Sequence, residues 1–566
     1  MARRFRSVGM VTAALLAVTL ATPLGLGAAM YEQLVTSPLA VSMGSAVTAY
    51  PPGAMAIHYN PAGLSKIPGT RFDNGIGFVS TYREVSLRQA DDPATGKPWA
   101  PFGGWFNNGR DPLDGAKGRQ ESGYMIIPYI DYAIPYLITP GMGISYKPPD
   151  PKFSRWTFGF GQFAPYGAGL KNAKNPQKNP MSFLGEKAFF SRMSFLTPAV
   201  AYRVSDTLSV GAAVGIGPSL FYLSSSLRTP NDMSALTGAL GEATEGLEIP
   251  VISELTLPPP WFNGGMTPYA THGHLELFVE DYFTTSYNLG VLWEPYEWFA
   301  LGACYQSSSE ANMEGDYEFK YGSEFRRTVD WLGRSPLTII TAAMFDLPTA
   351  SVPKQKGTAT FRLTWPQRLQ LGVKLKPIKQ LTLTCDANWT DWAVQKQWVM
   401  QFDQKIQLFR FARMLGYRYS PDTQVFVHDF KNTWHLSYGM EIKPVEKFAL
   451  RLGWDSRPAS TVHERFGPVP FPDFDIYSLG IGIVVDDKPK PRPKDFHELT
   501  QQINHANAID INVSYIKLKD TTIKSNTSKS LNSTVFTDIV YNPYAGLDWH
   551  QEMHLWWFAV NQVFKW

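Results

Sequence analysis

Polar and apolar residues alternate along the chain from Thr358 to Lys376. The even positions are mostly polar or charged, as at Thr360 and Lys374, whereas the odd positions are mostly apolar, as at Phe361 and Leu371. A period of two places successive side chains on opposite faces of a β-strand. The same alternation recurs in three later segments, at 381–390, 434–443 and 448–455. Much of the chain is therefore predicted to form strands with one polar and one apolar face.

The connections between the predicted strands alternate between short and long. Tight turns lie at Ser205-Asp206, Pro295-Tyr296, Pro377-Ile378 and Pro444-Val445. Long connections occupy 83–121, 165–188, 226–272, 309–356, 401–431, 457–473 and 520–550. Loops this long are uncommon in compact soluble domains, whereas outer-membrane barrels combine short periplasmic turns with long outer loops. The predicted strands, about fourteen in number, lie at 71–82, 122–138, 154–164, 189–203, 207–225, 273–293, 297–308, 357–376, 379–400, 432–443, 446–456, 474–486, 507–519 and 551–566.

The first 29 residues have the composition of an export signal. Their only charges are Arg3, Arg4 and Arg6, and an apolar run follows from Val8 to about Leu26. We predict a cleavable signal peptide over 1–29; a membrane-anchoring helix is the alternative, which the threonines and Pro23 disfavour. Without these three arginines the chain has 49 basic and 49 acidic residues. This balance argues against a nucleic-acid partner.

An exported chain with 44% hydrophobic and only 18% charged residues is either a large secreted β protein or an outer-membrane barrel. Strand order and loop lengths favour the barrel. We therefore predict an all-β protein of the Gram-negative outer membrane, a transmembrane antiparallel β-barrel over residues 71–566 that contacts membrane lipid and lipopolysaccharide. The chain ends in alternating apolar residues, Trp556, Phe558, Val560, Phe564 and Trp566, which resemble the terminal signal read by the barrel-assembly machinery.

Residues 30–70 precede the first predicted strand and have no place in the wall. They are rich in Ala, Gly, Ser and Pro. They form either a disordered periplasmic tail or a plug in the lumen. Apolar residues such as Met43, Val47, Met55, Ile57 and Leu64 favour the plug.

This segment contains Ser42-Met43-Gly44-Ser45-Ala46 and Asn60-Pro61-Ala62-Gly63-Leu64. Together with later motifs, it resembles the hatch of the FadL-type long-chain fatty-acid and hydrocarbon transporters, the OMPP1/FadL/TodX family. The later motifs follow in the family's order and include Ala164-Pro165-Tyr166-Gly167, Pro198-Ala199-Val200-Ala201-Tyr202-Arg203, Trp365-Pro366, Trp389-Thr390-Asp391-Trp392 and Pro472-Asp473. The long outer loops and the region after residue 520 depart most from the family pattern, which leaves the substrate undetermined.

The resemblance implies a monomeric, non-enzymatic barrel of fourteen strands that takes up hydrophobic small molecules passively. They would be captured at the outer face and would leave sideways through a kink in the third strand. Three hatch residues, Asn60, Pro61 and Ala62, are the gating candidates. Gly159, Gly161, Pro165 and Gly167 are the candidates for the kink, since glycine and proline weaken a strand ladder.

A carboxylate head group requires a cation in the lumen. Arg362 and Arg368 are predicted to share one strand face and are the head-group candidates, although lumenal cations also form salt-bridge networks that hold the wall. We find no catalytic residues, no metal-ligand pattern and no cofactor motif in the sequence. The alternatives to transport are an outer-membrane lipase-like hydrolase, and an adhesive or structural barrel.

Overall fold

The computed structural model describes residues 37–566, with gaps at 93–94, 131, 173–179, 184, 248, 253–254, 258–260, 415–418, 428–429, 461–471 and 525–542. The predicted signal peptide lies outside the described residues. Among the described residues, no helix is both long and apolar enough to cross a membrane.

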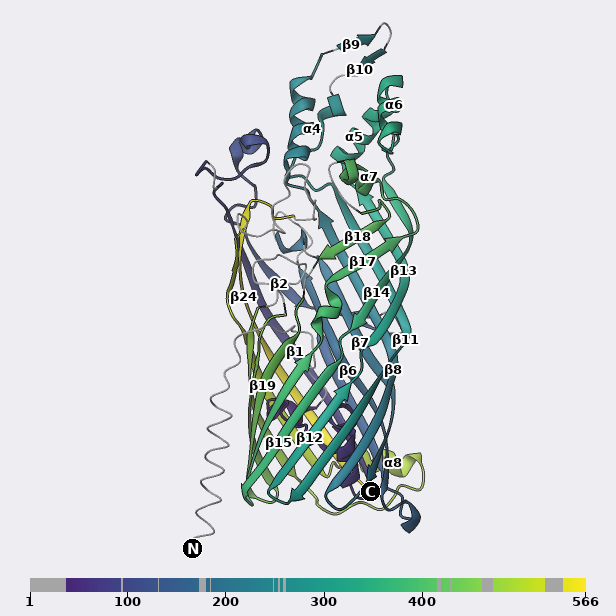
Figure 1. Cartoon of the computed structure of the whole chain (residues 1–566), viewed down its shortest axis with the longest axis vertical. Helices are drawn as coiled ribbons and strands as arrows, with labels where there is room; N and C mark the ends of the chain where they lie inside the picture. The colour runs from purple at the N-terminus through teal and green to yellow at the C-terminus, as the bar shows by residue number, and fades with distance from the viewer. Residues whose placement is uncertain are drawn as a thin grey trace.

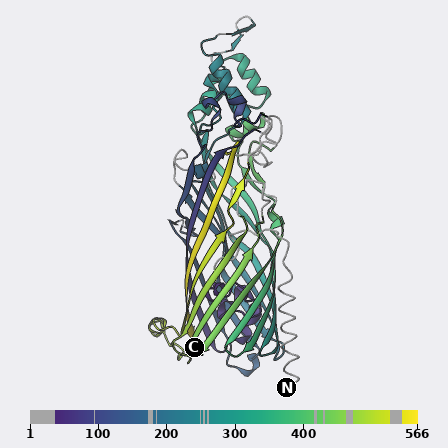
Figure 2. The same ribbon diagram turned by 90° about the vertical axis from the view of Figure 1, so that its left-hand side faces the viewer.

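Fourteen antiparallel strand positions form one closed barrel (Figures 1 and 2). The first strand pairs with the last along nearly its whole length, from Arg71↔Lys565 to Gln89↔Leu547, which closes the wall. Fourteen strands confirm the number expected from the alternation. In chain order the wall strands are β1 (Thr70–Gln89), β2 (Lys117–Gly123) with β5 (Leu137–Tyr146), β6 (Trp156–Asn172), β7 (Lys187–Arg203), β8 (Leu208–Leu227), β11 (Gly273–Tyr296), β12 (Phe299–Gln306) with β13 (Ser309–Tyr321), β14 (Lys354–Trp365) with β15 (Arg368–Ile378), β16 (Leu381–Thr390) with β17 (Gln397–Phe402), β18 (Thr423–Val427) with β19 (Thr433–Val445), β20 (Phe448–Arg457), β21 (Phe474–Val484), β22 (Ala508–Leu518) with β23 (Thr521–Ile523), and β24 (Leu547–Lys565).

The two ends of the barrel differ. The tight turns and the C-terminus lie at the lower end in Figure 1, which is therefore the periplasmic end. This end also carries η5 (Pro151–Phe153) and α8 (Phe496–Ile503). The long connections rise above the opposite, extracellular end. Among their elements are η3 (Pro101–Gly104), η4 (Asn107–Gly109), η6 (Pro180–Phe183), α4 (Asp232–Ala243), β9 (Ile249–Ile252), β10 (Leu255–Leu257), η7 (Trp261–Gly264), α5 (Ser323–Leu332), α6 (Pro336–Met344) and α7 (Gln407–Met414).

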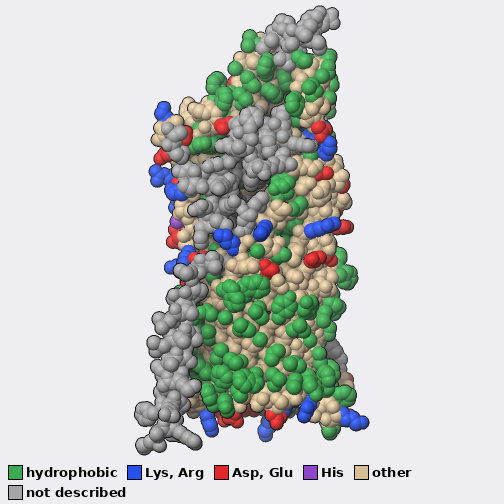
Figure 3. Space-filling view, viewed as in Figure 1, with side chains coloured by type: hydrophobic (Ala, Val, Ile, Leu, Met, Phe, Trp, Pro, Cys, Tyr) green, Lys and Arg blue, Asp and Glu red, His purple; other side chains and the backbone are tan. Residues whose placement is uncertain are grey.

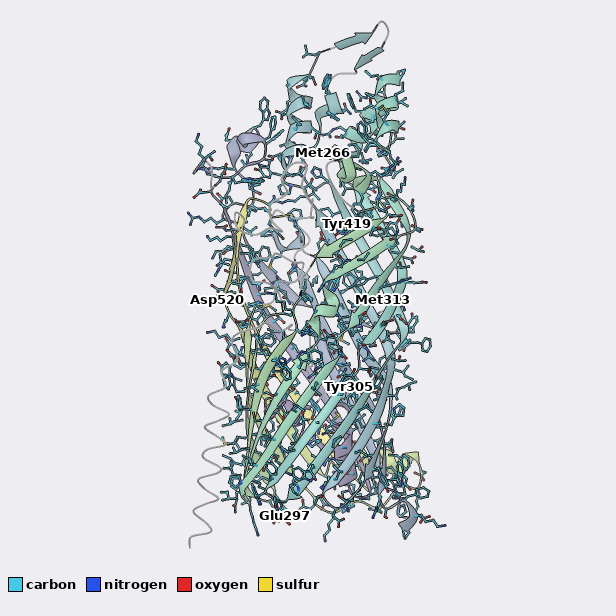
Figure 4. All side chains as sticks on the ribbon, viewed as in Figure 1. Met266, Glu297, Tyr305, Met313, Tyr419 and Asp520 are labelled. Atoms are coloured by element: carbon cyan, nitrogen blue, oxygen red, sulfur yellow. The ribbon has the colours of Figure 1, made fainter. Side chains whose placement is uncertain are left out.

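Several predicted boundaries differ from the structure, and two of them change the shape of the wall. The strand expected at 122–138 is divided: β2 and β5 belong to the wall, and between them a hairpin of β3 (Met125–Ile127) and β4 (Tyr132–Ile134) leaves it. The loop expected at 309–356 begins with β13, which extends the barrel upward by continuing the line of β12. In Figure 4 Glu297, Tyr305 and Met313 lie at successively greater heights along this part of the wall.

The outer surface of the barrel wall carries a dense apolar band in its lower part. Figure 3 shows a dense hydrophobic band there and charged groups above it. Along β24 the outward side chains change from Val560, Phe558 and Trp556 below to Glu552 and Asp548 above. The apolar band marks the membrane-spanning zone, and the barrel continues beyond the membrane on the extracellular side.

Above the membrane the apolar face of the strands turns inward. In β15 the even-numbered Arg368 and Gln370 face the lumen, as predicted, but in β14 the even-numbered residues face outward and Phe361 points in. Pro366 and Gln367 separate the two strands. Across this break the inward-facing positions change from odd-numbered in β14 to even-numbered in β15. Arg362 is therefore exposed on the outer surface, and its prediction as a head-group ligand beside Arg368 is wrong, because one alternation was extended across this break.

The inward apolar side chains form a continuous cluster in the upper lumen. Its strand residues include Phe190, Phe221, Phe361 and Trp398, and α5 and α7 add Phe325 and Phe409. Trp398 packs edge-to-face on Phe221 with ring centroids 5.8 Å apart. Trp392, in η8 (Trp392–Gln395), is also completely buried. Trp392 and Trp398 therefore lie inside the lumen and not at the membrane interface.

The lower lumen is occupied by residues 37–69, which we call the hatch segment. It contains α2 (Pro38–Ser42), η1 (Gly53–Met55), α3 (Ala56–Tyr59) and η2 (Pro61–Lys66). Met43, Val47, Met55, Ile57 and Leu64 are buried in it, as expected for a plug. In Figures 1 and 2 the segment lies inside the lower part of the barrel.

Candidate functional site

Asn60 joins the hatch segment to itself and to the wall. Its side-chain Nδ2 donates to the carbonyl oxygens of Thr48 at 2.8 Å and of Val291 at 3.0 Å. Its Oδ1 accepts from the backbone N–H of Ala62 at 3.2 Å and so caps η2. Asn60 is completely buried, which makes each of these bonds costly to lose.

Pro61 and Ala62 pack directly on the wall. Pro61 occupies the first position of η2, where its missing N–H is tolerated. Facing them are Gly211 of β8 and Gly290 of β11; a Cβ at Gly211 would lie 2.4 Å from the Ala62 nitrogen, and one at Gly290 would lie 2.8 Å from Cδ of Pro61. The absence of a side chain at these two wall positions lets the backbone of the hatch segment approach the strands.

Wall side chains hold the rest of the hatch segment through its backbone. The Asp386 carboxylate accepts from the N–H of Thr48 at 2.8 Å, and Asp73 accepts from Ala54 at 2.7 Å. Asn288 Nδ2 donates to the carbonyl of His58 at 3.0 Å. These contacts come from three different strands, so the segment is fixed on several sides of the lumen.

Lumenal salt bridges brace the wall beside the hatch segment. Arg451 bonds Glu441 and Asp510, in each case at 2.7 Å. Tyr50 of the hatch segment donates to the same Glu441 at 2.9 Å. Arg451 thus belongs to a salt-bridge network that holds the wall, which is the alternative to ligand binding for a lumenal cation.

The third wall position contains a gap in the strand ladder. β6 pairs with β5 from Phe158 to Gln162 and with β2 from Leu170 to Asn172. Along this fully described stretch, residues 163–169 have no register partner on that edge. The pairing with β7 is also irregular, with register shifts at Gly161/Phe163 and Phe163/Tyr166. The predicted kink residues lie at or beside this gap.

Gly159 and Gly161 make room at the gap for the hatch segment and for Phe163. A Cβ at Gly159 would lie 3.0 Å from side-chain carbons of Ile57 and Leu64 in the hatch segment. A Cβ at Gly161 would lie 2.5 Å from the Phe163 ring, which packs in the same cluster as Ile57 and Leu64.

Pro165 and Gly167 lie within the stretch of β6 that lacks partners on this edge. Pro165 is buried and has no N–H to offer a neighbouring strand. Gly167 has more space around it than Gly161. A Cβ at Gly167 would meet only Ser191 at 3.8 Å and Phe190 at 3.9 Å. Pro165 therefore cannot donate a ladder hydrogen bond across the gap, and Gly167 leaves space beside it.

Tyr166 and Trp365 form the lower limit of the apolar cluster. Their rings stack with centroids 5.0 Å apart. The Tyr166 hydroxyl donates to the carbonyl of Pro366 at 3.0 Å, and Trp365 Nε1 donates to Ser219 Oγ at 3.0 Å. Polar groups begin directly below this pair.

The sequence interpretation missed Arg192, which lies at this boundary and is opposite Tyr166 in the β6–β7 register. Its guanidinium is buried and donates to Ser309 Oγ at 3.0 Å, Ser194 Oγ at 3.1 Å and Ser286 Oγ at 2.9 Å. A longer bond reaches the carbonyl of Gly215. In the part of the chain that the structure describes, no carboxylate pairs with Arg192.

Arg368 faces the lumen as predicted and is 2% exposed. It and Arg192 both interact electrostatically with His58 of the hatch segment. His58 also packs against the Phe163 ring, with centroids 5.5 Å apart. The cations Arg192 and Arg368 therefore lie close to the wall gap. The site thus combines an apolar upper lumen, a cationic boundary, a hatch below and a gap at the side.

A barrel with this apolar outer band, an occupied lumen and a side gap defines a class, the outer-membrane channels for hydrophobic compounds. The family model for outer membrane protein transport proteins (OMPP1/FadL/TodX) matches residues 17–490. The chain therefore belongs to the OMPP1/FadL/TodX family and is an outer-membrane transporter of hydrophobic compounds rather than an enzyme.

Solved structures agree with the fold. A FadL homologue of Pseudomonas aeruginosa is similar with a TM-score of 0.63 and 16% identity, covering 95% of this chain and 100% of the other. The toluene transporter TodX of P. putida gives 0.55 and 14%, and the toluene transporter TbuX of Ralstonia pickettii gives 0.54 and 15%; each comparison covers 94% of this chain and 99% of the other. Curated protein sequences contain no match to this chain. At these identities the likeness supports the fold alone.

Proposed function

We propose that this protein takes up hydrophobic compounds that carry a carboxylate, such as long-chain fatty acids, by passive diffusion. The compound enters from the extracellular side along the apolar upper lumen. It leaves sideways through the gap beside Phe163 into the membrane, and the hatch segment with Asn60, Pro61 and Ala62 controls the passage.

The observation that carries this proposal is the position of Arg192. A buried cation without a counter-charge is costly, and among the described residues Arg192 has only neutral hydrogen-bond partners. Beside it lies the aromatic pair Tyr166 and Trp365, with Tyr166 opposite Arg192 in the strand register. A carboxylate would supply the missing charge while its alkyl chain lies among the apolar side chains.

The free-energy terms suit passive transport. Each methylene transferred from water to an apolar lining gains roughly 0.8 kcal/mol. The membrane core offers the same gain, so the compound is not trapped by its tail. What retains it at the boundary is the charged head group, and the gap adjoins that boundary.

The direct test of the substrate class is to identify what the purified barrel binds. The protein is extracted in a mild detergent, and bound compounds are identified by mass spectrometry together with the affinities for palmitate and for hexadecane. The proposal expects bound carboxylates and tighter binding of palmitate. Equal affinity for hexadecane would favour a hydrocarbon channel, and an empty lumen with no binding of either would contradict the proposal.

A further inference from the structure

The β3–β4 hairpin lies outside the barrel wall. It leaves the wall after Gly123, which pairs with Leu170, and returns at Leu137, which pairs with Val79. Its inner face, Tyr124, Met125 and Ile126, packs with outward side chains of β7 and β8 that include Phe189 and Leu220. The hairpin therefore covers the outer face of the wall next to the gap in β6.

The outer face of this hairpin is apolar and has no cover among the described residues. Tyr129, Ile130, Tyr132 and Tyr136 are 55%, 66%, 63% and 64% exposed. In the sequence from Tyr124 to Tyr136, Asp131 is the only charged residue. Such a surface is unfavourable in water but suits the boundary of a bilayer, where Tyr is enriched.

The hairpin is continuous with the upper edge of the apolar outer band. The Tyr129 ring lies 5.5 Å from Phe195 of β7 and 5.2 Å from Tyr282 of β11. Next to Tyr282, Phe283 is among the most exposed large apolar side chains of the wall. Above it, the outward positions of β11 are Glu280, Phe278 and Glu276, and Phe278 packs against the cluster of the hairpin. The hairpin thus lies where the lipid-facing surface gives way to the water-facing surface.

We infer that the outer face of the β3–β4 hairpin, formed by Tyr129, Ile130, Tyr132 and Tyr136, inserts into the bilayer interface and anchors this side of the barrel in the outer leaflet. The occupant of the surface is lipid, because the apolar band that the hairpin extends is itself the membrane contact. This inference depends on the membrane location and not on the proposed substrate.

Site-directed spin labelling measures the insertion. Single cysteines are introduced as Ile130→Cys, Ile340→Cys and Leu289→Cys in a Cys304→Ala, Cys385→Ala background, and the labelled barrels are reconstituted in phosphatidylcholine vesicles. Collisions with oxygen report lipid exposure, and collisions with a water-soluble nickel complex report water exposure. Ile340, on the extracellular helix α6, is the matched control in water, and Leu289, outward on β11, is the control in lipid.

We expect the label at 130 to favour oxygen over the nickel complex, as at 289, whereas the label at 340 shows the reverse. A label at 130 that is as accessible to nickel as the label at 340 would overturn the inference. Protection from both reagents would also overturn it, in favour of a protein neighbour. If Ile130→Cys does not give a heat-modifiable folded barrel, Tyr132→Cys provides the same measurement.

Discussion

The side-chain amide of Asn60 donates a hydrogen bond to the carbonyl oxygen of Val291 at 3.0 Å, and this bond joins the hatch segment to the periplasmic part of β11. Asn60 lies four residues before Leu64, and Leu64 packs at the gap in β6. The gating candidate and the lateral gap are therefore parts of one packed unit.

Replacing Asn60 by Ala should reduce uptake while the barrel still folds. The change leaves the buried carbonyls of Thr48 and Val291 without this donor, at a cost of about 1–3 kcal/mol, and lets η2 shift against Phe163. Asn60→Asp is the control that keeps the acceptor for Ala62 but removes both donors. Uptake of a labelled fatty acid by whole cells measures the effect. Wild-type uptake by Asn60→Ala would remove the Asn-Pro-Ala motif from the mechanism.

The gap should be sensitive to a methyl group at Gly161 and tolerant of one at Gly167. At Gly161 the new Cβ would lie 2.5 Å from the Phe163 ring, which must move, whereas at Gly167 the nearest atom is 3.8 Å away. We expect Gly161→Ala to lower uptake several-fold and Gly167→Ala to match the wild type, with both barrels folded. Equal uptake by the two variants would show that the Phe163 position does not control exit.

Arg192→Met should weaken carboxylate binding selectively. Loss of a charge-assisted hydrogen bond costs about 1.5–3 kcal/mol, or roughly 10- to 100-fold in affinity. Binding of hexadecane should change little, since the apolar lining is intact. Arg362→Met is the matched control, because Arg362 faces outward and its loss should leave both affinities unchanged. An unchanged palmitate affinity in Arg192→Met would exclude this cation as the head-group site.

The extracellular loops should lose stability in acid through His272. Burial lowers the pKa of this histidine to about 4, despite the opposing effect of Glu324. The unfolded chain has the ordinary value of about 6.5 and binds the proton more readily, so the stabilisation is complete above that pH and is lost as pH falls from about 6.5 to about 4. The difference amounts to about 3 kcal/mol.

Proteolysis can check whether stability falls as the pH is lowered. His272 joins the end of β8 to the start of α5, since its N–H donates to Leu227 and its carbonyl accepts from Gly322. Cleavage in this region should therefore accelerate between pH 6.5 and 4 in the wild type, and His272→Gln should flatten the dependence. A wild-type rate that does not change over this range would refute the assignment.

The alternation of residues predicted the strand class and the membrane-facing half of the wall. In β19, for example, Trp434 faces out and His435 faces in, as the sequence indicates. It failed above the membrane, because an apolar face is favoured on the lipid side in one zone and on the lumen side in the other. One alternation of inward and outward positions therefore cannot describe both the membrane-spanning wall and the wall above it. Extending the lower alternation to Arg362 places this residue in the lumen, where it does not lie.

Arg192 could not be found from the sequence for a related reason. It lies in the run from Phe189 to Ser194, where both faces are buried, by the lumen on one side and by the hairpin on the other. No alternation is left to indicate which way the arginine points. Asn60-Pro61-Ala62 is easier to single out, because it is a contiguous motif that resembles the family's hatch motif; its gating role stays a prediction.

We expect hydrophobic carboxylates to pass through this barrel into the membrane. The most direct test compares palmitate uptake by cells that lack their own transporter and express the wild type, the Arg192→Met variant or an empty vector, with folded barrel confirmed by its heat-dependent gel migration. We predict fast uptake with the wild type and slow uptake with Arg192→Met. Wild-type cells that take up palmitate no faster than empty-vector cells would contradict it.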